Sequence, residues 1–573
     1  MMPFLWEHVT CDDARARALA GALGVSPVIA RLLSIRGLDD PGAAERFLRP
    51  SIEHLHDPLL LTDMRLAVER ILAAMARRER IAVHGDYDVD GVTSTVILRR
   101  ALEMFGADVV HFIPDRLRDG YGLQVEAVER LHAEGVAVII SVDCGIRAVE
   151  AARRARDLGI DLIITDHHEP GLTLPPALAV INPKRHDCSY PDKHLAGVGV
   201  ALKLVQALCQ RQGREHWLPA FVKVAAIGTL ADVVPLVGEN RVIAKLGLEM
   251  LSRGPHKVGL RALLEVAGLA GKPIDGGHVA FMIAPRVNAA GRMSTPEIAA
   301  RLLLAADENM AGEAQALARQ LDGENSRRQE EEAAILTEAR RAIETDPDIG
   351  ARSLLVVSGD GWHRGVIGVV ASKLVDIFHR PVIVLSVEDG VAHGSCRSIP
   401  AFDMLGALER CAPHLMRFGG HRQAAGLTME AARVKAFRAD MTAHADEMLG
   451  PDDLKPRLRI DAGLGFRDIT GDVAGQLTML APFGPGNPRP VFEASGVEVV
   501  DGPRRLKEKH LKMALRHDGR VVRAIAWRAA EREQFIHEHR GALDLAFSLE
   551  QNTYRGDVFL EISVADVKAS RRP

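Results

Sequence analysis

The segment Ile81-Ala-Val-His84-Gly-Asp86-Tyr-Asp88-Val-Asp90-Gly91 joins a short apolar run to three carboxylates and an imidazole. An apolar run that ends in a loop of Gly and Asp is typical of a buried strand in an α/β sheet. Three negative charges this close repel one another by roughly a few kcal/mol at an effective dielectric near 20. Because a bound cation would remove that repulsion, we interpret the cluster as half of a metal site.

Two other interpretations of this segment are weaker. A single Asp after a strand is commonly a turn or helix-cap residue, but this does not explain a cluster. The spacing of Asp86, Asp88 and Asp90 also fits the start of an EF-hand calcium loop. That loop needs a bidentate Glu at its twelfth position, where this chain has Ile97, and here a strand precedes it rather than a helix. We therefore reject the EF-hand.

The alternation of strand, loop and helix continues beyond this segment. We expect strands at residues 81–85, 136–142 and 161–165, and helices at 93–104 and 147–158. Continuous apolar strands that alternate with helices predict a doubly wound parallel sheet, in which ligands bind beyond the carboxyl ends of the strands. The expected fold class is therefore α/β.

The rest of the chain divides into further regions. A helical region is expected from 200 to 345, and its charge run is typical of a solvated helix face. Strands expected at 521–527, 543–549 and 558–564 predict a small C-terminal barrel, with an OB-fold as the first choice. The predicted domains are an N-terminal helical segment (1–70), a catalytic α/β domain (71–305), a connecting helix (306–350), a second α/β domain (351–452) and a β-rich domain (453–573).

Size and composition exclude several classes of protein. The 573 residues, 47% of them hydrophobic, are enough for several cores. The six Cys form no C-x-x-C pair, which argues against a zinc ribbon or a disulfide framework. The sequence has no basic leader and no apolar stretch of about 18 residues, so we expect a cytoplasmic protein without membrane contact. The net charge of −4 means that any nucleic-acid site must be a local basic groove.

Three more clusters of acidic and imidazole side chains occur where this topology would bring them together. Asp143 ends one expected strand, the pair His167 and His168 follows the next, and Asp232 follows an apolar helix. Mixed oxygen and nitrogen ligands suit Mn²⁺ or Mg²⁺, and the imidazoles favour Mn²⁺. Two such ions roughly 3.5–4 Å apart can clamp the attacking and leaving oxygens of a phosphoryl displacement.

These clusters resemble, in order, the motifs of the DHH phosphoesterase superfamily: HGDYDVDG (84–91), SVDCG (141–145), TDHHEP (165–170) and GTLADVVPL (228–236). Within that superfamily the chain resembles the RecJ family over about residues 50–560. The segments that carry this second resemblance are IPDRLRDGYGL (113–123), APRVNAAGRM (284–293), SGDGWHRGVIGVVASKL (358–374), GSCRSI (394–399) and FGGHRQAAGLTM (418–429). The resemblance implies a DHH domain, a DHHA1-type second domain and an OB-fold-like barrel.

The resemblance also implies a set of ligands for two metal ions. One ion would be held by His84 and Asp88. The other would be held by Asp90, His167 and Asp232, and Asp143 would bridge both. Beside the scissile phosphate, His168 would stabilise charge or protonate the leaving oxygen. The carboxylates expected to orient this machinery are Asp86 and Asp166.

Residues that read the substrate are expected on Arg-rich segments, because Arg side chains and backbone amides recognise phosphate. The resemblance implies that Arg116, Ser395 and Arg397 lie near the terminal 5′ phosphate, with Arg118 as the alternative to Arg116. The other candidates are Arg286, Asn288, Arg292, His363 and His421.

A single-stranded-DNA-specific 5′→3′ exonuclease that releases 5′-mononucleotides is the implied activity, with a role in recombination and repair. The implied partners are a helicase and a single-strand-binding protein, and we expect a monomer. One alternative is a DHH phosphoesterase for oligoribonucleotides or small phosphoesters, although the chain length and the β-rich tail count against it. The other is a non-catalytic replication-fork protein, which the complete ligand set disfavours.

Overall fold

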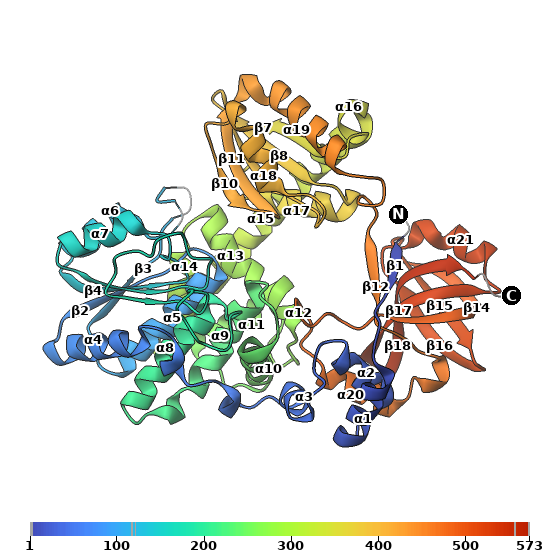
Figure 1. Cartoon of the computed structure of the whole chain (residues 1–573), viewed down its shortest axis with the longest axis horizontal. Helices are drawn as coiled ribbons and strands as arrows, with labels where there is room; N and C mark the ends of the chain where they lie inside the picture. The colour runs from blue at the N-terminus through green and yellow to red at the C-terminus, as the bar shows by residue number, and fades with distance from the viewer. Residues whose placement is uncertain (1–3, 116–117, 121, 555–556, 571–573) are drawn as a thin grey trace. The chain divides into compact units, whose positions relative to one another are not determined.

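The computed structural model describes residues 4–115, 118–120, 122–554 and 557–570. The chain folds as two compact units (Figure 1). The larger unit comprises Val9–Glu324 and Asp461–Pro573, and the smaller comprises Asn325–Ile460 with the N-terminal strand. Each unit has its own sheets and cores, so each positions a different group of the predicted site residues.

A five-stranded parallel sheet lies at the centre of the larger unit and confirms the predicted fold class. Its carboxyl edge carries the loops with the acidic clusters. For the two strands that begin at Val136 and Asp161, the predicted bounds coincide with the observed ones. From one edge the strands are β3 (Val109–Phe112), β2 (Arg80–His84), β4 (Val136–Val142), β5 (Asp161–Thr165) and β6 (Ala179–Ile181).

Helices cover both faces of this sheet (Figure 1). In β2, Ile81 and Val83 belong to the core on one face, whereas Ala82 belongs to the core on the other. A sheet buried on both faces requires uninterrupted apolar strands, which explains the composition of β2 and β4. The helices of the first core are α4 (Met64–Arg77), α5 (Val89–Met104) and α8 (Gly197–Arg211), and those of the second are α6 (Val125–Ala133) and α7 (Val149–Asp157).

Helix α5 begins at Val89, earlier than the predicted residue 93. The reason is a side-chain cap: the carboxylate of Asp88 accepts hydrogen bonds from the backbone N–H groups of Asp90 and Gly91. Asp90 therefore lies in the first turn of a helix instead of in a loop, and the helix fixes the direction of the Asp90 side chain.

The predicted helical region is present, and it ends in the long helix α15 (Ala311–Thr345), which runs from the larger unit into the smaller one. Its charged face is not wholly solvated, contrary to the expectation. Glu332 is only 3% exposed and pairs with Lys373, and Glu338 accepts a hydrogen bond from the indole of Trp362. Among the described residues, no single helix is both long and apolar enough to cross a membrane. Other helices of the region are α9 (Pro219–Ala231), α10 (Gly238–Arg253) and α13 (Ala284–Met293).

The smaller unit contains a mixed five-stranded sheet and a feature that the sequence did not predict. Strand β1 (Leu5–His8) pairs in parallel with β12 (Arg457–Ile460), whereas residues 1–70 were expected to be helical. The partner of β1 lies several hundred residues away in the sequence, so no local pattern reveals the pairing. The sheet consists of β10 (Arg417–His421), β11 (Ala424–Glu430), β9 (Val391–Arg397), β8 (Val382–Glu388) and β7 (Leu355–Asp360).

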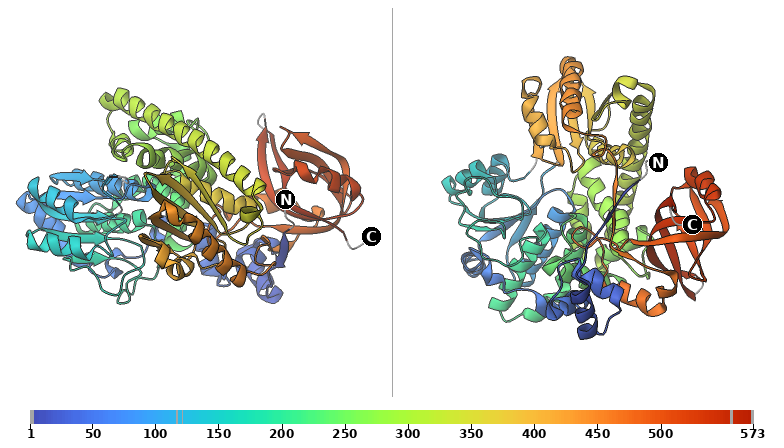
Figure 2. Two further views of the ribbon diagram at one scale, coloured as in Figure 1. Left: turned by 90° about the horizontal axis from the view of Figure 1, so that it is seen from above. Right: turned by 45° about the vertical axis from the view of Figure 1, so that its right-hand side comes forward.

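The C-terminal strands close into a barrel through a pairing between β14 and β17, as predicted (Figures 1 and 2). Its core is shared with the first helices of the chain, because Ile29 and Leu33 pack with Phe466 and Phe492. In sheet order the barrel strands are β13 (Ala462–Gly463), β14 (Phe492–Leu506), β15 (His510–His517), β16 (Arg520–Ala526), β18 (Asp557–Ala569) and β17 (Leu543–Tyr554).

Candidate metal centre

The predicted ligands converge at the carboxyl edge of the parallel sheet. His84 is the last residue of β2, and Asp143 directly follows β4 with a φ of +60°. His167 follows β5, and Asp232 ends α9. Each of these residues thus stands at the end of a buried strand or helix, where the regular backbone fixes its position.

His167 lies at the centre of this cluster. Its Nε2 atom is 3.2 Å from Asp143 Oδ1, 3.6 Å from Asp232 Oδ2 and 4.0 Å from Asp90 Oδ2. Among the described residues, His167 Nε2, Asp143 Oδ1 and Asp232 Oδ2 are buried and have no hydrogen-bond partner of good geometry, and the same holds for His84 Nε2. Buried polar atoms are normally satisfied, so a convergent group without partners fits ligands for a cation.

Three overlapping groups could each hold an ion, since their ligand atoms lie within 4.8 Å of one another. Mixed carboxylate and imidazole donors of this kind suit Mn²⁺ or Mg²⁺. Two of the groups share Asp143, and two share His167. The groups are Asp86 with Asp88 and Asp143, Asp90 with His167 and Asp232, and Asp143 with His167 and His168.

The first turn of α8 holds the carboxylate of Asp90. Its two oxygens accept hydrogen bonds of 2.7 Å from the backbone N–H groups of Gly197 and Val198. A Cβ atom at Gly197 would lie 2.3 Å from Asp143 Oδ1, so the absence of a side chain lets α8 approach both carboxylates. Sequence reasoning missed this support, although the glycines at 197 and 199 at the start of an apolar helix are its signal.

Asp166 and His168 form a pair beside the cluster. Asp166 Oδ1 accepts hydrogen bonds from His168 Nδ1 at 2.7 Å and from the backbone N–H groups of His167 and His168, while Oδ2 accepts one from Ile146. Burial acts to lower the pKa of His168, but the hydrogen bond and the charge of Asp166 outweigh it and raise that pKa. The imidazole is therefore oriented and biased toward carrying a proton.

Burial and mutual repulsion shift the pKa values of the cluster when no cation is present. Desolvation, followed by the charges of neighbouring carboxylates, raises the pKa of Asp90 to about 7 and of Asp232 to about 9, and raises the pKa of Asp143 well above its usual range. Burial lowers the pKa of His84 to about 4 and of His167 to about 3. Neutral imidazoles next to crowded carboxylates are a donor set that a divalent ion would stabilise.

Two residues of α13 make hydrogen bonds to other parts of the protein. The amide oxygen of Asn288 accepts a hydrogen bond of 3.1 Å from the N–H of Val89 and so supports the start of α5. The guanidinium of Arg286 donates to Asp322 and to the carbonyl of Met282, and its side chain is only 16% exposed. These contacts hold the Arg286 guanidinium in place on α13, and its contact with phosphate stays a prediction. Arg292 is half-buried near the end of the same helix.

The remaining candidates lie in the smaller unit. Arg397 donates to Ser395 Oγ at 3.3 Å, and both residues stand on β9 beside Gly368 in the first turn of α17 (Ile367–Phe378). A helix N-terminus next to an Arg and a Ser is a suitable environment for phosphate. His363 Nδ1 accepts a hydrogen bond from Gly365, and His421 is exposed at the end of β10.

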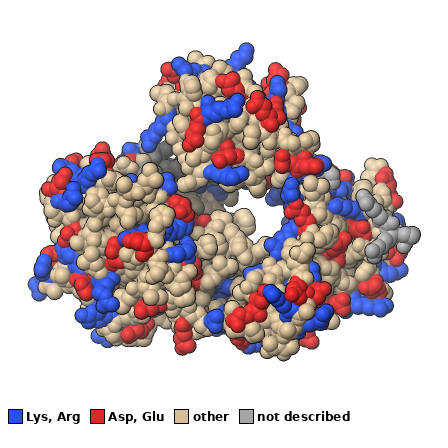
Figure 3. Space-filling model, in the orientation of Figure 1, with Lys and Arg blue, Asp and Glu red and all other residues tan. Residues whose placement is uncertain are grey.

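On the face drawn in Figure 3, basic residues do not form one continuous surface. Basic and acidic side chains are interspersed over the face drawn in Figure 3. Arg116 lies outside the described residues. Its neighbour Arg118 is 75% exposed and pairs with Asp115 at 3.2 Å.

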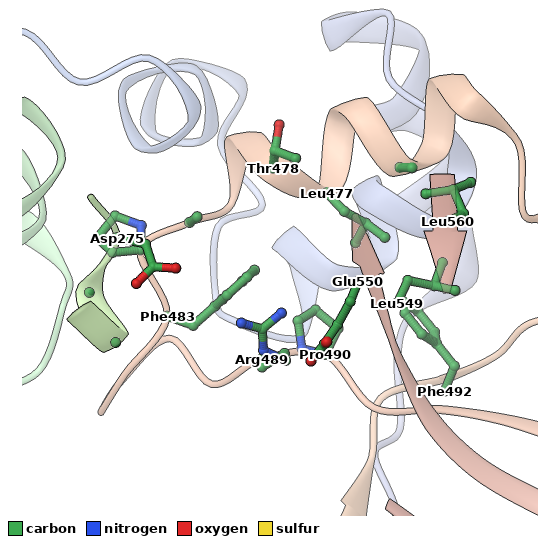
Figure 4. A pocket seen from close by; sticks show the side chains of 15 residues that line it. Asp275, Leu477, Thr478, Phe483, Arg489, Pro490, Phe492, Leu549, Glu550 and Leu560 are labelled. Atoms are coloured by element: carbon green, nitrogen blue, oxygen red, sulfur yellow. The ribbon is translucent and has the colours of Figure 1, made fainter. Parts of the chain in front are cut away.

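A separate cavity of about 520 Å³ lies between the segment at Asp275 and the barrel. Figure 4 shows Phe483, Arg489, Leu477 and Leu549 along its walls. The Arg489 guanidinium lies 5.1 Å from the centre of the Phe483 ring. None of the residues of the acidic and imidazole cluster lines this cavity.

Comparison with known proteins agrees with this arrangement. Residues 80–229 match the DHH family N-terminal domain, 351–446 the DHHA1 domain and 460–566 the RecJ OB domain. The single-stranded-DNA-specific exonuclease RecJ of Bacillus subtilis (strain 168) is 39% identical over 536 residues, covering 93% of this chain and 66% of that protein. The RecJ of Escherichia coli (strain K12) is 35% identical over 564 residues, covering 94% of this chain and 96% of that protein.

A RecJ from Thermus thermophilus provides the structural comparison. Its crystal structure in complex with Mn²⁺ has a TM-score of 0.84 and 34% identity, over 99% of this chain and 80% of that chain. Its crystal structure in complex with Mg²⁺ has a TM-score of 0.78 and 32% identity, over 99% of this chain and 78% of that chain.

Proposed function

Because this chain belongs to the RecJ family of DHH proteins, we propose that it is an exonuclease that hydrolyses single-stranded DNA from the 5′ end and releases 5′-mononucleotides. It would use two divalent ions, Mn²⁺ or Mg²⁺, and act in recombination and repair on strands opened by a helicase and bound by a single-strand-binding protein. The observation that carries this proposal is the convergence of buried atoms without hydrogen-bond partners around His167 Nε2.

We assign the ligands by their grouping. His84 and Asp88 would hold one ion, and the clustering of Asp86 with Asp88 and Asp143 supports Asp86 as a further ligand. The second ion would be held by Asp90, His167 and Asp232. Asp143 would serve both ions, since it belongs to groups on either side.

When bound, the two ions would activate water for in-line attack and offset the charge that builds on the phosphoryl oxygens. The chain's own residues would position and move protons. Asp166 fixes the ring of His168 through Nδ1, so Nε2 is the nitrogen placed to hold or give a proton to the leaving oxygen. The raised pKa of His168 supports this role.

In the smaller unit, Ser395 and Arg397 would bind the terminal 5′ phosphate together with the first turn of α17. A bound anion there would gain from the Arg charge and from the N–H groups at the helix start. His363 and His421 would contact the DNA backbone nearby in that unit. Arg116 stays a candidate for the same phosphate on sequence grounds.

The test is digestion of end-labelled DNA by the full chain. We expect 5′-phosphorylated single strands to be degraded with Mn²⁺ or Mg²⁺, and neither duplex DNA nor a chelator-treated sample to react. Asp88→Ala should lower the rate by more than about a hundredfold, a larger loss than outer-sphere substitutions cause. Asp472→Ala, an exposed Asp on the barrel side of the unit, is the matched control. Faster hydrolysis of dinucleotides than of long strands would instead favour the small-phosphoester alternative.

A further inference from the structure

The backbone directly after the proposed metal ligand Asp232 has an unusual conformation. The next residue, Val233, has a φ of +62° and is 68% exposed. A β-branched L-residue rarely adopts this left-handed region, and holding it there costs on the order of 1–3 kcal/mol. Such a conformation persists only where the surrounding structure enforces it, and the exposed side chain of Val233 does not supply that enforcement.

The loop that precedes the barrel holds the segment after Val233 in place. The N–H of Leu236 donates a hydrogen bond of 2.7 Å to the carbonyl of Pro485. The two glycines that flank Pro485 pack directly on the same segment. A Cβ atom at Gly484 would lie 2.8 Å from Leu236 Cδ1, and one at Gly486 would lie 3.1 Å from Pro235 Cβ. Gly486 also has a φ of +71°, which favours glycine.

The loop is itself held rigidly within the larger unit. The amide of Asn487, which is fully buried, donates to the carbonyls of Leu480 and Pro482 at 2.7 and 2.8 Å. Arg241, 1% exposed, donates to the carbonyl of Leu480 at 2.9 Å and to its neighbours. The other side of the loop continues into the cavity wall at Phe483 (Figure 4). The loop therefore has the rigidity that a support requires.

We infer that residues 484–486 are positioning residues for the metal site: they clamp residues 235–237, enforce the strained turn at Val233 and so hold Asp232 in its ligand position. The inference rests on the proposed role of Asp232 as a metal ligand. Residues 484–486 belong to the loop that precedes the C-terminal barrel. This loop would therefore have a function in metal binding, in addition to any contact of the barrel with DNA.

The test is Mn²⁺ titration of the full, metal-free chain, with free Mn²⁺ measured by electron paramagnetic resonance. Gly486→Ala should weaken binding of the more weakly held ion by about tenfold, as disturbance of outer-sphere supports does. Gly496→Ala is the matched control, because Gly496 has a φ of +74° but nothing within 4 Å of its Cβ position. It should leave the binding unchanged. Val233→Gly combined with Gly486→Ala should recover affinity, since glycine tolerates the left-handed turn without enforcement.

If Gly486→Ala does not fold, Gly484→Ala replaces it, because that position requires no positive φ and tests only the contact with Leu236. Unchanged Mn²⁺ binding in the clamp variant, or an equal loss in Gly496→Ala, would overturn the inference. Asp232→Ala is measured in parallel. If that variant binds Mn²⁺ like the parent chain, the proposed ligand role of Asp232 fails, which is a result distinct from failure of the clamp.

Discussion

At the scale of single residues, the site depends on which nitrogen of each imidazole is available. A neutral His that binds a metal through Nε2 must carry its hydrogen on Nδ1, and the partner of Nδ1 fixes the ring. For His84 that partner is the thiol of Cys144, whose Sγ lies 3.7 Å from Nδ1. Burial raises the pKa of Cys144, so the thiol stays neutral and accepts the Nδ1–H.

Cys144→Ala should therefore weaken Mn²⁺ binding by about tenfold, because the ring of His84 loses its orienting partner. Cys209→Ala is the control, since Cys209 is equally buried in α8 but makes no contact with the cluster. Metal titration of both variants decides the matter. Equal affinities would mean that the backbone alone orients His84.

The residues proposed as ligands could be picked out from the sequence because most of them stand at the end of a strand or helix with a clear apolar pattern. Asp143 follows a strand whose bounds were predicted, and Asp232 follows a helix that was recognised by its apolar composition. The supports of those ligands could not be found in this way. The contact from α8 to Asp90 and the contact from Pro485 to Leu236 join segments far apart in the sequence, and the glycines at 197 and 199 mark the first contact without naming its partner.

At the scale of elements, a buried ion pair joins α8 to α10. Lys203 Nζ lies 2.9 Å from Glu239 Oε1, and the two side chains are 0% and 1% exposed. Glu239 also accepts hydrogen bonds from the hydroxyl of Tyr190 and the N–H of His56. This cluster of side chains holds α8, whose first turn donates to Asp90, against α10, which follows residues 235–237.

Lys203→Met should lower the free energy of unfolding by about 3–5 kcal/mol, because it leaves the Glu239 carboxylate buried without a cation. Adding Glu239→Gln should restore part of that loss, since the amide carries no charge, its oxygen still accepts from the N–H of His56, and its NH2 group can donate to the hydroxyl oxygen of Tyr190. Denaturant unfolding of the single and double variants measures the difference. A double variant less stable than Lys203→Met would contradict this account of the pair.

The three central strands of the sheet, β2, β4 and β5, could be predicted, but the edge strands β3 and β6 and the distant pairings could not. The runs that became β4 and β5 are continuous and apolar, so their bounds follow from composition. The start of α5 was misplaced because a capping Asp is indistinguishable in sequence from a loop Asp. Strand β1 was missed because its partner β12 lies several hundred residues away in the sequence and alternates charged with apolar residues.

At the scale of the whole molecule, the net charge is −4, and on the face drawn in Figure 3 basic side chains are dispersed among acidic ones. Without a net positive charge, we expect attraction of DNA to come from a few local cations. For single strands, the logarithm of affinity falls with the logarithm of salt concentration with a slope of about −0.7 per neutralised phosphate.

We expect a slope of about −2 to −4 for an inactive Asp88→Ala chain, which corresponds to a handful of phosphate contacts. Fluorescence anisotropy of a labelled single strand between low and moderate salt measures it. Replacing Arg397 by Ala should make the slope shallower, whereas replacing Arg49, an exposed residue outside the predicted site, should not. A slope of about −10 would instead indicate an extended basic surface.

The central claim is that separate loops of the parallel sheet hold a pair of divalent ions. Anomalous diffraction from crystals of the full chain soaked in Mn²⁺ tests it most directly. Two manganese peaks should appear, one beside His84 and Asp88 and the other beside His167 and Asp232, with Asp143 in contact with both. Anomalous maps without density at these side chains, from soaked crystals whose enzyme still degrades single-stranded DNA, would contradict the account.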